Sequence, residues 1–297
     1  QGYSEFPLAG GRAVLTLVPG RYTLSVSDAG GKGTGVFAFR LLDLGAALPV
    51  TPDDGVIHRM PVGAMSQAFR INADEGDQLV FDFLSSTQTA SWRLVSGFGD
   101  QVFRDSLTSD QGPVRIGAGG PYILIVEGLN GIVDANDIGF IVRRVGHQPT
   151  MPPTGRDLPL GEWLSTTRTS AAQQDDFVFT LAAQTRLVFD ARTGTNALAW
   201  SLTGPRGTTE PRGLQQDGTL YNDFPVALDL APGAYKLRVQ GNATGDYQFR
   251  LLDLASAMPI APGTPRTLVL DPGNSTAMFS FDASAGQRMF FDMQART

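Results

Sequence analysis

The sequence predicts an all-β protein, built as tandem antiparallel β-sandwich domains of the jelly-roll kind with about eight strands per unit. Three observations support this prediction: a long internal repeat, a two-residue alternation of apolar side chains inside every recurring segment, and turn residues between the segments. The chain has 297 residues, including 35 glycines and 19 prolines. No window of about 12 residues keeps a helical period free of Gly or Pro well enough to predict a helix.

The composition agrees with this class and excludes several others. The chain has 24 Asp against 5 Glu and 21 Arg against 2 Lys, so the residues that usually coat a solvated helix are scarce. It has no cysteine, which excludes disulfide scaffolds, thiolate metal sites and thiol nucleophiles. The net charge of −6 argues against nucleic acid as a partner, because no basic patch could release counterions. No apolar run is long enough to span a membrane.

The internal repeat decides the predicted domain organisation. The segment Phe39-Arg-Leu-Leu-Asp-Leu44 recurs as Phe249-Arg-Leu-Leu-Asp-Leu254, 210 residues later, and other elements place a further copy between them. The period of roughly 100–109 residues is long enough for each unit to close its own core. We therefore predict the C-terminal half of a repeat at 1–45, complete repeats at 46–145 and 146–254, and the N-terminal half of a repeat at 255–297. The simplest interpretation is a window from a longer array; the alternative is a chain whose ends pair with neighbouring chains.

Alternation and turn signals place the strands of the first complete unit. Leu79, Phe81 and Phe83 share one face of a strand, while Asp82 falls on the other. The eight expected strands lie near residues 56–60, 66–71, 78–83, 91–96, 101–105, 113–117, 121–127 and 138–145. The linkers at 45–49 and 254–259 are short, so we expect consecutive units to behave as a semi-rigid rod.

Several repeated segments resemble a known bacterial family. Ala285-Gly-Gln-Arg-Met-Phe-Phe-Asp292 and Leu230-Ala-Pro-Gly-Ala-Tyr-Lys-Leu-Arg-Val239 are similar to strands of the pre-peptidase C-terminal domain, as found in tandem copies in very large secreted or surface proteins. The resemblance covers the whole chain, although Ala183-Gln-Thr-Arg186 departs from the Gly-Gln pattern. It implies a β-sandwich without catalytic activity of its own that accompanies secreted enzymes or builds surface proteins. Some relatives bind calcium and collagen-like ligands.

The residues needed for catalysis do not form a known motif. Neither histidine, His58 or His147, lies in a repeated element, and no motif of a hydrolase, zinc protease or phosphate-binding loop is present. The glycine-rich segment 30–35 falls between two expected strands, which favours a hairpin over a phosphate loop. The acid pairs at 53–54 and 175–176 are interpreted as solvated loop or strand-edge residues. We therefore predict no enzyme activity and no catalytic residue.

Calcium is the candidate cofactor, because it prefers oxygen ligands carried by loops. Asp134, Asn136 and Asp137 follow Asn130 in an alternating acidic stretch that lacks the bidentate Glu of a complete calcium loop. A second candidate group is Asp74, Glu75 and Asp77, whose counterpart in the last copy carries no acid before the glycine. A metal site would therefore belong to single copies.

Recurring polar and aromatic residues indicate shared structural needs. Asp82, Asp190 and Asp292 are interpreted as strand-end turn formers. Arg40 with Asp43 and Arg250 with Asp253 are interpreted as contacts between consecutive domains. The recurring aromatics are expected in the cores: Tyr22, Tyr122, Tyr235, Trp92 and Trp200. Trp163 has no counterpart in the other copies and is the candidate binding residue.

Together these features predict a non-catalytic structural or adhesive repeat segment of a large secreted or cell-surface bacterial protein. Such a segment would serve as a spacer rod, an extracellular filament or an adhesin stalk. The expected partners are neighbouring repeats, other copies in a fibre, or a surface glycan or protein. The alternative function is a calcium-dependent carbohydrate- or collagen-binding accessory module of a secreted hydrolase.

Overall fold

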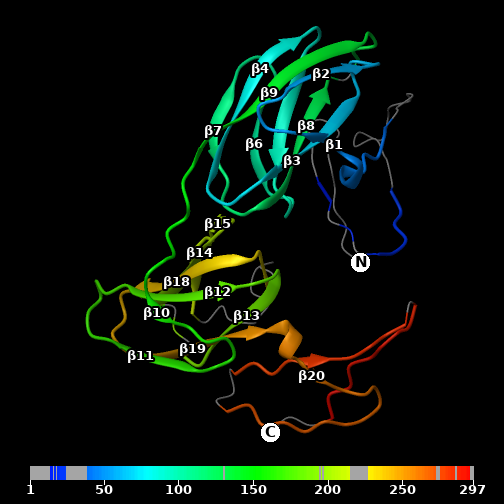
Figure 1. Cartoon of the computed structure of the whole chain (residues 1–297). Coiled ribbons are helices and arrows are strands. Elements are labelled where there is room, and N and C mark those ends of the chain that lie inside the picture. The colour runs from blue at the N-terminus through cyan, green and yellow to red at the C-terminus, as the bar shows by residue number, and fades with distance from the viewer. Residues whose placement is uncertain are drawn as a thin grey trace, which may run out of the picture. The chain divides into compact units, whose positions relative to one another are not determined.

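A computed structural model shows two compact units, residues 1–151 and 152–297 (Figure 1). The described residues are 14–15, 17, 19–24, 39–129, 131–193, 195, 197–214, 227–271, 275–284 and 286–294. The expected hairpin at 30–35 and the candidate ligand Asn130 lie outside them.

Unit 1 contains a sandwich of two sheets. The five-stranded sheet has the order β1-β3-β8-β5-β6, and the four-stranded sheet has the order β2-β9-β4-β7. The strands are β1 Leu48–Val50, β2 Gly55–Met60, β3 Ser66–Ala73, β4 Asp77–Ser86, β5 Ala90–Val95, β6 Gln101–Ser106, β7 Gln111–Arg115, β8 Gly120–Gly128 and β9 Asn136–His147. All eight expected strands are present at nearly the predicted residues.

Unit 2 repeats this arrangement. One sheet has the order β10-β12-β18-β14-β15, with β16 paired to β14, and the other has the order β11-β19-β13-β17. The strands are β10 Arg156–Asp157, β11 Leu164–Arg168, β12 Asp175–Leu181, β13 Thr185–Ala191, β14 Leu198–Gly204, β15 Gly207–Thr208, β16 Arg212–Gly213, β17 Ala227–Leu230, β18 Gly233–Gly241 and β19 Gly245–Asp253. The predicted all-β sandwich fold is confirmed.

Each sandwich has its own core, filled from both of its sheets. In unit 1 the core includes Trp92, Phe81 and Phe140; in unit 2 it includes Trp200 and Phe189, the latter stacked on Trp200 with ring centroids 4.3 Å apart. Period-two alternation explains this, because every second side chain of a strand faces the opposing sheet. The predicted core positions of Trp92, Trp200, Tyr122 and Tyr235 are confirmed, whereas the side chain of Tyr22 is 54% exposed.

The first strand of each sandwich differs from the expectation. β1 and β10 pair in parallel with β3 and β12, while the other strand pairs of the two sandwiches are antiparallel. β1 overlaps the linker predicted at 45–49, because a strand of three residues with a central proline shows no alternation. The linker therefore contributes a strand to the sheet that follows it.

Two short 3-10 turns precede such first strands. They are η1 (Leu44–Ala46) and η2 (Leu254–Ser256), capped by the carboxylates of Asp43 and Asp253, which accept from the backbone N–H two residues on. After η2, β20 (Met258–Pro259) pairs in parallel with β21 (Phe279–Ser280). Among the described residues, no helix is long and apolar enough to cross a membrane.

Candidate functional site at the end of the second sandwich

A buried ion pair connects the second sandwich to the segment that follows it. Asp190 on β13 lies opposite Arg250 on β19, and its carboxylate accepts from Arg250 Nε at 2.7 Å. Arg250 Nη2 donates to the carbonyl oxygen of Thr276 at 3.0 Å, and the Thr276 N–H returns a bond of 3.0 Å to Asp190 Oδ1. Asp190 is fully buried. We call these three residues the junction clamp.

The clamp corrects the interpretation of the repeated aspartates. Asp190 lies within β13 and is an ion-pair partner, not a turn former. Its equivalent Asp82 lies inside β4 and pairs with Arg143 on β9. Both aspartates lie inside strands that continue past them. Each pairs with an arginine of the neighbouring strand instead of forming a turn.

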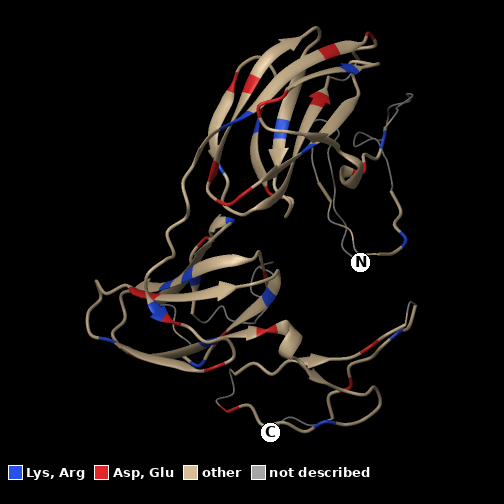
Figure 2. Ribbon diagram, in the orientation of Figure 1, with Lys and Arg blue, Asp and Glu red and all other residues tan. Residues whose placement is uncertain are grey.

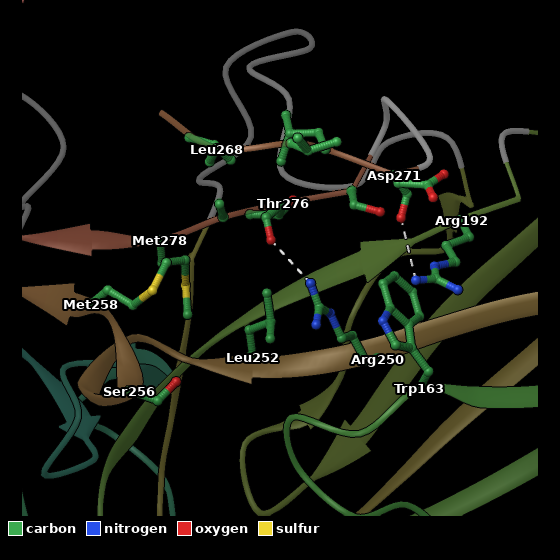
Figure 3. A pocket seen from close by; sticks show the side chains of 14 residues that line it. Trp163, Arg192, Arg250, Leu252, Ser256, Met258, Leu268, Asp271, Thr276 and Met278 are labelled. Carbon is green, nitrogen blue, oxygen red and sulfur yellow. Dashed lines mark hydrogen bonds between the residues drawn. The ribbon is translucent and has the colours of Figure 1, made fainter. Parts of the chain in front are cut away.

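Trp163 lies against the clamp, half-buried between two arginines (Figure 3). The guanidinium carbons of Arg192 and Arg250 each lie 4.2 Å from the centre of its ring. Arg192 Nη2 also donates to the carbonyl oxygen of Asp271 at 3.4 Å. Two cations stacked on one aromatic ring add attraction and fix the arginine side chains.

A pocket of about 400 Å³ lies between this stack and the segment after η2. Besides the clamp and stack residues, its walls carry apolar side chains and two serines, among them Leu252, Ser256, Met258, Leu268, Ser275 and Met278. Figure 3 shows Arg250 between Trp163 and Thr276 at one wall of the pocket. The described residues of its lining include hydroxyl groups and one carboxylate but no histidine or thiol.

The first sandwich lacks this stack. The strand registers make Gly55, Leu84 and Ile141 the equivalents of Trp163, Arg192 and Arg250. Correspondingly, no 3-10 turn is found in the described residues between β9 and β10. Trp163 is a predicted binding residue, whereas Arg192 is not among the residues predicted from the sequence. All three residues of the stack are replaced together in unit 1. This joint replacement is the sequence signal from which the group of Trp163, Arg192 and Arg250 could have been predicted.

A matching contact occurs at the start of unit 1. Arg40, the equivalent of Arg250, donates to the carbonyl oxygen of Ser66, which is the equivalent of Thr276. Arg40 and Arg250 therefore each contact the segment that follows the next 3-10 turn, and their role as contacts between consecutive domains stays a prediction. Asp43 and Asp253 instead cap the local 3-10 turns.

The first calcium candidates are engaged in different contacts. The Oδ1 of Asn136, which is fully buried, accepts from the backbone N–H groups of Thr87 and Gln88 at 3.1 and 3.0 Å. Asp137 pairs with Arg59 at 2.8 Å on the surface, and Asp134 is exposed. Asn136 therefore closes the β4–β5 turn.

The second group of calcium candidates is also not assembled as a site. Asp74 and Glu75 are exposed, whereas Asp77 is buried and accepts from the Asp74 N–H, from Arg144 Nε at 3.1 Å and from His147 at 2.9 Å. Burial raises the pKa of Asp77, but these three partners outweigh it and hold the pKa below its usual range. Among the described residues, no group of three or more His, Asp or Glu side chains converges as a metal site.

The paired acids and the other histidine have structural partners. Asp176 faces Arg238 across β12 and β18 at 2.7 Å, and this hydrogen bond lowers the pKa of Asp176. Asp175 accepts from the Tyr247 hydroxyl at 2.8 Å. His58 packs edge-on against Phe69 with ring centroids 5.6 Å apart. Figure 2 shows acidic and basic residues interspersed along the strands of both units.

The fold and the clamp define a tandem β-sandwich protein. No family model matches the chain, and no curated protein matches its sequence. Matching solved structures include the CUB1-EGF-CUB2 domain of human MASP-1/3, with 6% identity and a TM-score of 0.21 over 66% of this chain and 99% of that one. Another is A223, a turret protein in Sulfolobus turreted icosahedral virus, with 13% identity and a TM-score of 0.20 over 67% of this chain and 97% of that one. At these TM-scores neither likeness bears on function.

Proposed function

We propose that the chain is a non-catalytic structural or adhesive repeat segment of a large secreted or cell-surface bacterial protein. The observation that supports this role is the recurring contact between one repeat and the next. Arg40 to Ser66 and Arg250 to Thr276 are equivalent bonds, and each joins an arginine that precedes a capped 3-10 turn to a residue that follows it. Such contacts hold the start of the following repeat in a defined place, which is what a load-bearing or spacing element requires.

The secreted location rests on the resemblance to tandem pre-peptidase C-terminal domains. The absence of cysteine agrees with a unit whose stability comes from a large aromatic core, and both complete sandwiches have one. Secretion and surface attachment are proposals that the parent gene and its flanking segments can test.

The clamp can be tested by moving the arginine from position 250 to position 252, which corresponds to the position of Arg143 in unit 1. Arg143 has Leu252 as its equivalent in unit 2, so the double variant Arg250→Ile/Leu252→Arg keeps a partner for Asp190 while removing the bond to Thr276. A hydrogen bond to a charged group contributes about 1.5–3 kcal/mol, so the local opening equilibrium should rise about tenfold or more. Hydrogen exchange of the Thr276, Met258 and Ile260 amides should then accelerate, while amides of β12 and β18 keep their protection.

Exposed Arg186, on β13, provides the control. Arg186→Ile also removes one arginine, and it should leave exchange after η2 unchanged. Equal exchange of the three amides in the double variant and the parent chain would show that the clamp does not hold the following repeat, and would remove the main support for the structural role.

Calcium binding is a second proposal, for the exposed carboxylates of Asp134 and Asp137. Binding there requires Asp137 to leave Arg59, since that pair occupies its carboxylate. A ligand that binds only the folded state raises the melting temperature. We expect millimolar calcium to raise the Tm and Asp134→Asn to remove the increase. The same Tm in calcium and in chelator would contradict the proposal.

A further inference from the structure

The edge strand β2 of the first sandwich carries main-chain groups that point away from its sheet. β2 lies at one end of the sheet β2-β9-β4-β7 and pairs with β9. Opposite Arg59 stands Asp137 of β9, whose N–H and carbonyl oxygen bond to Thr87, on the side of β9 away from β2. In an antiparallel ladder the two residues of such a pair point away from each other. The N–H and C=O of Arg59 therefore point to the free edge of the sheet.

The alternation of the ladder extends this orientation along the strand. Ile57 and Gly55 lie two and four residues before Arg59, so their main-chain groups also point to the free edge. Among the described residues, no hydrogen bond reaches these six groups. We call the main-chain groups of Gly55, Ile57 and Arg59 the open edge. An unpaired strand edge of this kind is a template for another strand.

The second sandwich closes the same edge with side chains. By the strand registers, Ser165 and Thr167 of β11 occupy the positions of the last two residues of the open edge. The carbonyl oxygen of Ser165 accepts from Arg156 Nη1 at 3.1 Å, and that of Thr167 accepts from Gln173 Nε2 at 3.4 Å. Unit 2 therefore covers, with its own side chains, the acceptors that unit 1 leaves free.

The side chains beside the open edge are apolar in unit 1. Ile57 is 74% exposed and Leu84 is 48% exposed. They approach each other over Gly139, because a Cβ at Gly139 would lie 2.9 Å from Ile57 Cδ1 and 3.4 Å from Leu84 Cβ. In unit 2 the polar residues Ser165 and Arg192 take the places of these two apolar residues. An apolar strip therefore leads to the strand edge in the unit whose edge is open.

The open edge is complementary to itself. In an antiparallel pair, residues directly opposite each other share one face of the sheet. If two copies pair about a two-fold axis at Ile57, each Ile57 stands opposite the other and each Gly55 stands opposite an Arg59. This register pairs every group of the open edge and brings the two exposed Ile57 side chains together. A shift by two residues in either direction leaves part of the edge unpaired.

Charge complementarity favours the same register. It places Arg59 beside the start of β2 in the second copy, and the exposed acids Asp53 and Asp54 directly precede that start. Pairing about Arg59 instead would set two arginines opposite each other, and like charges directly opposite destabilise a strand pair. The register centred on Ile57 therefore brings opposite charges together at both ends of the paired strands.

We propose that two copies of this chain bind each other through β2, antiparallel and about a two-fold axis at Ile57, so that two four-stranded sheets join into one. Strand addition of this kind gains affinity from main-chain hydrogen bonds and register from side chains. A two-fold contact is filled by one second copy, so the product through this edge is a dimer. One strand of six residues offers less area than a standard interface of about 1,600 Å², so the dimer should dissociate on dilution. The proposal names a partner for the structural role proposed above and rests on that role.

Hydrogen exchange at several protein concentrations tests the pairing residue by residue. The amides of Ile57 and Arg59 should exchange rapidly in dilute protein, and about tenfold or more slowly at several hundred micromolar, because only the dimer gives them acceptors. The alternate amides of Val56 and His58 face β9 and should stay protected throughout, so they serve as the internal reference. Exchange of Ile57 and Arg59 that does not depend on concentration would overturn the proposal.

A pair of opposite charges tests the two-fold register by sedimentation velocity. Ile57→Lys and Ile57→Asp should each weaken self-association about tenfold or more, because each sets like charges opposite each other and removes the apolar contact. An equimolar mixture of the two variants should associate more tightly than either alone, since lysine then stands opposite aspartate. Val133→Lys is the matched control, because Val133 is 79% exposed and lies outside β2.

Three results would contradict pairing at Ile57: equal self-association of Ile57→Lys and the parent chain, a mixture no tighter than its components, or equal loss of association in Val133→Lys. If the edge instead binds a different protein, the parent chain stays monomeric at every concentration, which also overturns the proposal. Circular dichroism checks that each variant keeps the fold. None of these results bears on the clamp, because amide exchange after η2 measures the clamp within a single chain.

Discussion

Replacing Arg168 by methionine is expected to lower the free energy of unfolding of the second sandwich by about 3–5 kcal/mol. The side chain of Arg168 is fully buried, and it donates to the carbonyl oxygens of Ala243 at 3.1 Å and Gly241 at 3.0 Å. It also lies 3.4 Å from the carboxylate of Asp175. Removing the guanidinium leaves these acceptors without their donor inside the protein, which costs more than the methionine gains by packing.

The first sandwich explains why methionine is the informative substitution. Met60 is the equivalent of Arg168, and it is 1% exposed. Opposite Met60 stands Asn136, whose side chain closes the adjacent turn, whereas opposite Arg168 stands Gly245, which has no side chain. Gly245 on β19 offers no polar side chain, so unit 2 needs a long polar side chain at Arg168 on the paired strand β11.

Chemical denaturation measures the loss of stability in Arg168→Met, and hydrogen exchange locates it in the chain. The protection of β11 and β19 should fall in Arg168→Met, while the strands of unit 1 serve as an internal reference. Arg186→Met, at an exposed position, controls for the loss of a positive charge. A change in stability below about 1 kcal/mol, the size of one ordinary hydrogen bond, would contradict the assigned role.

Trp200→Ala should cost about 3–5 kcal/mol, again in the second sandwich alone. Trp200 is 1% exposed and stacks on Phe189, so alanine leaves a large cavity between the sheets. Among the described residues its Nε1 has no hydrogen-bond partner. Trp200→Phe, which keeps an aromatic ring and removes that buried donor, should therefore cost clearly less than Trp200→Ala.

The matched variant is Trp92→Ala in the first sandwich. Trp92 is fully buried in a core that shares no residue with the core around Trp200. Each alanine variant should lower exchange protection only in its own sandwich. Loss of protection in both sandwiches from either variant would show that the two units do not unfold independently.

Strand positions could be predicted because their signals are local. A strand such as β18 alternates buried and accessible residues around Tyr235 and Leu237, and their equivalents Tyr122 and Leu124 in β8 are buried as well. Recurrence in several copies turned weak local patterns into a secure fold class. β1 and β10 were missed because strands of two or three residues are too short to show alternation.

The site was only partly predictable. Arg250 was identified as a contact to the next repeat because it recurs at Arg40, and Trp163 was identified because it does not recur. The role of Asp190 was mistaken, since a strand-end Asp usually makes a turn, whereas here it binds Arg250 and Thr276. Asn136 was assigned to calcium by its acidic neighbours, but its carbonyl oxygen accepts bonds from a turn that is distant in sequence.

By itself the sequence determined the repeat, the all-β class and the residues that enter each core, because alternation and recurrence are properties of short segments. Only the tertiary structure decided which polar side chains meet. Asp190, Arg250 and Thr276 come from β13, from β19 and from the segment after η2, and their contact depends on the register of one strand pair and on where the following linker turns. The same is true of Arg168. Buried carbonyl oxygens need it as their hydrogen-bond donor, because the residue opposite it on the paired strand is a glycine without a side chain.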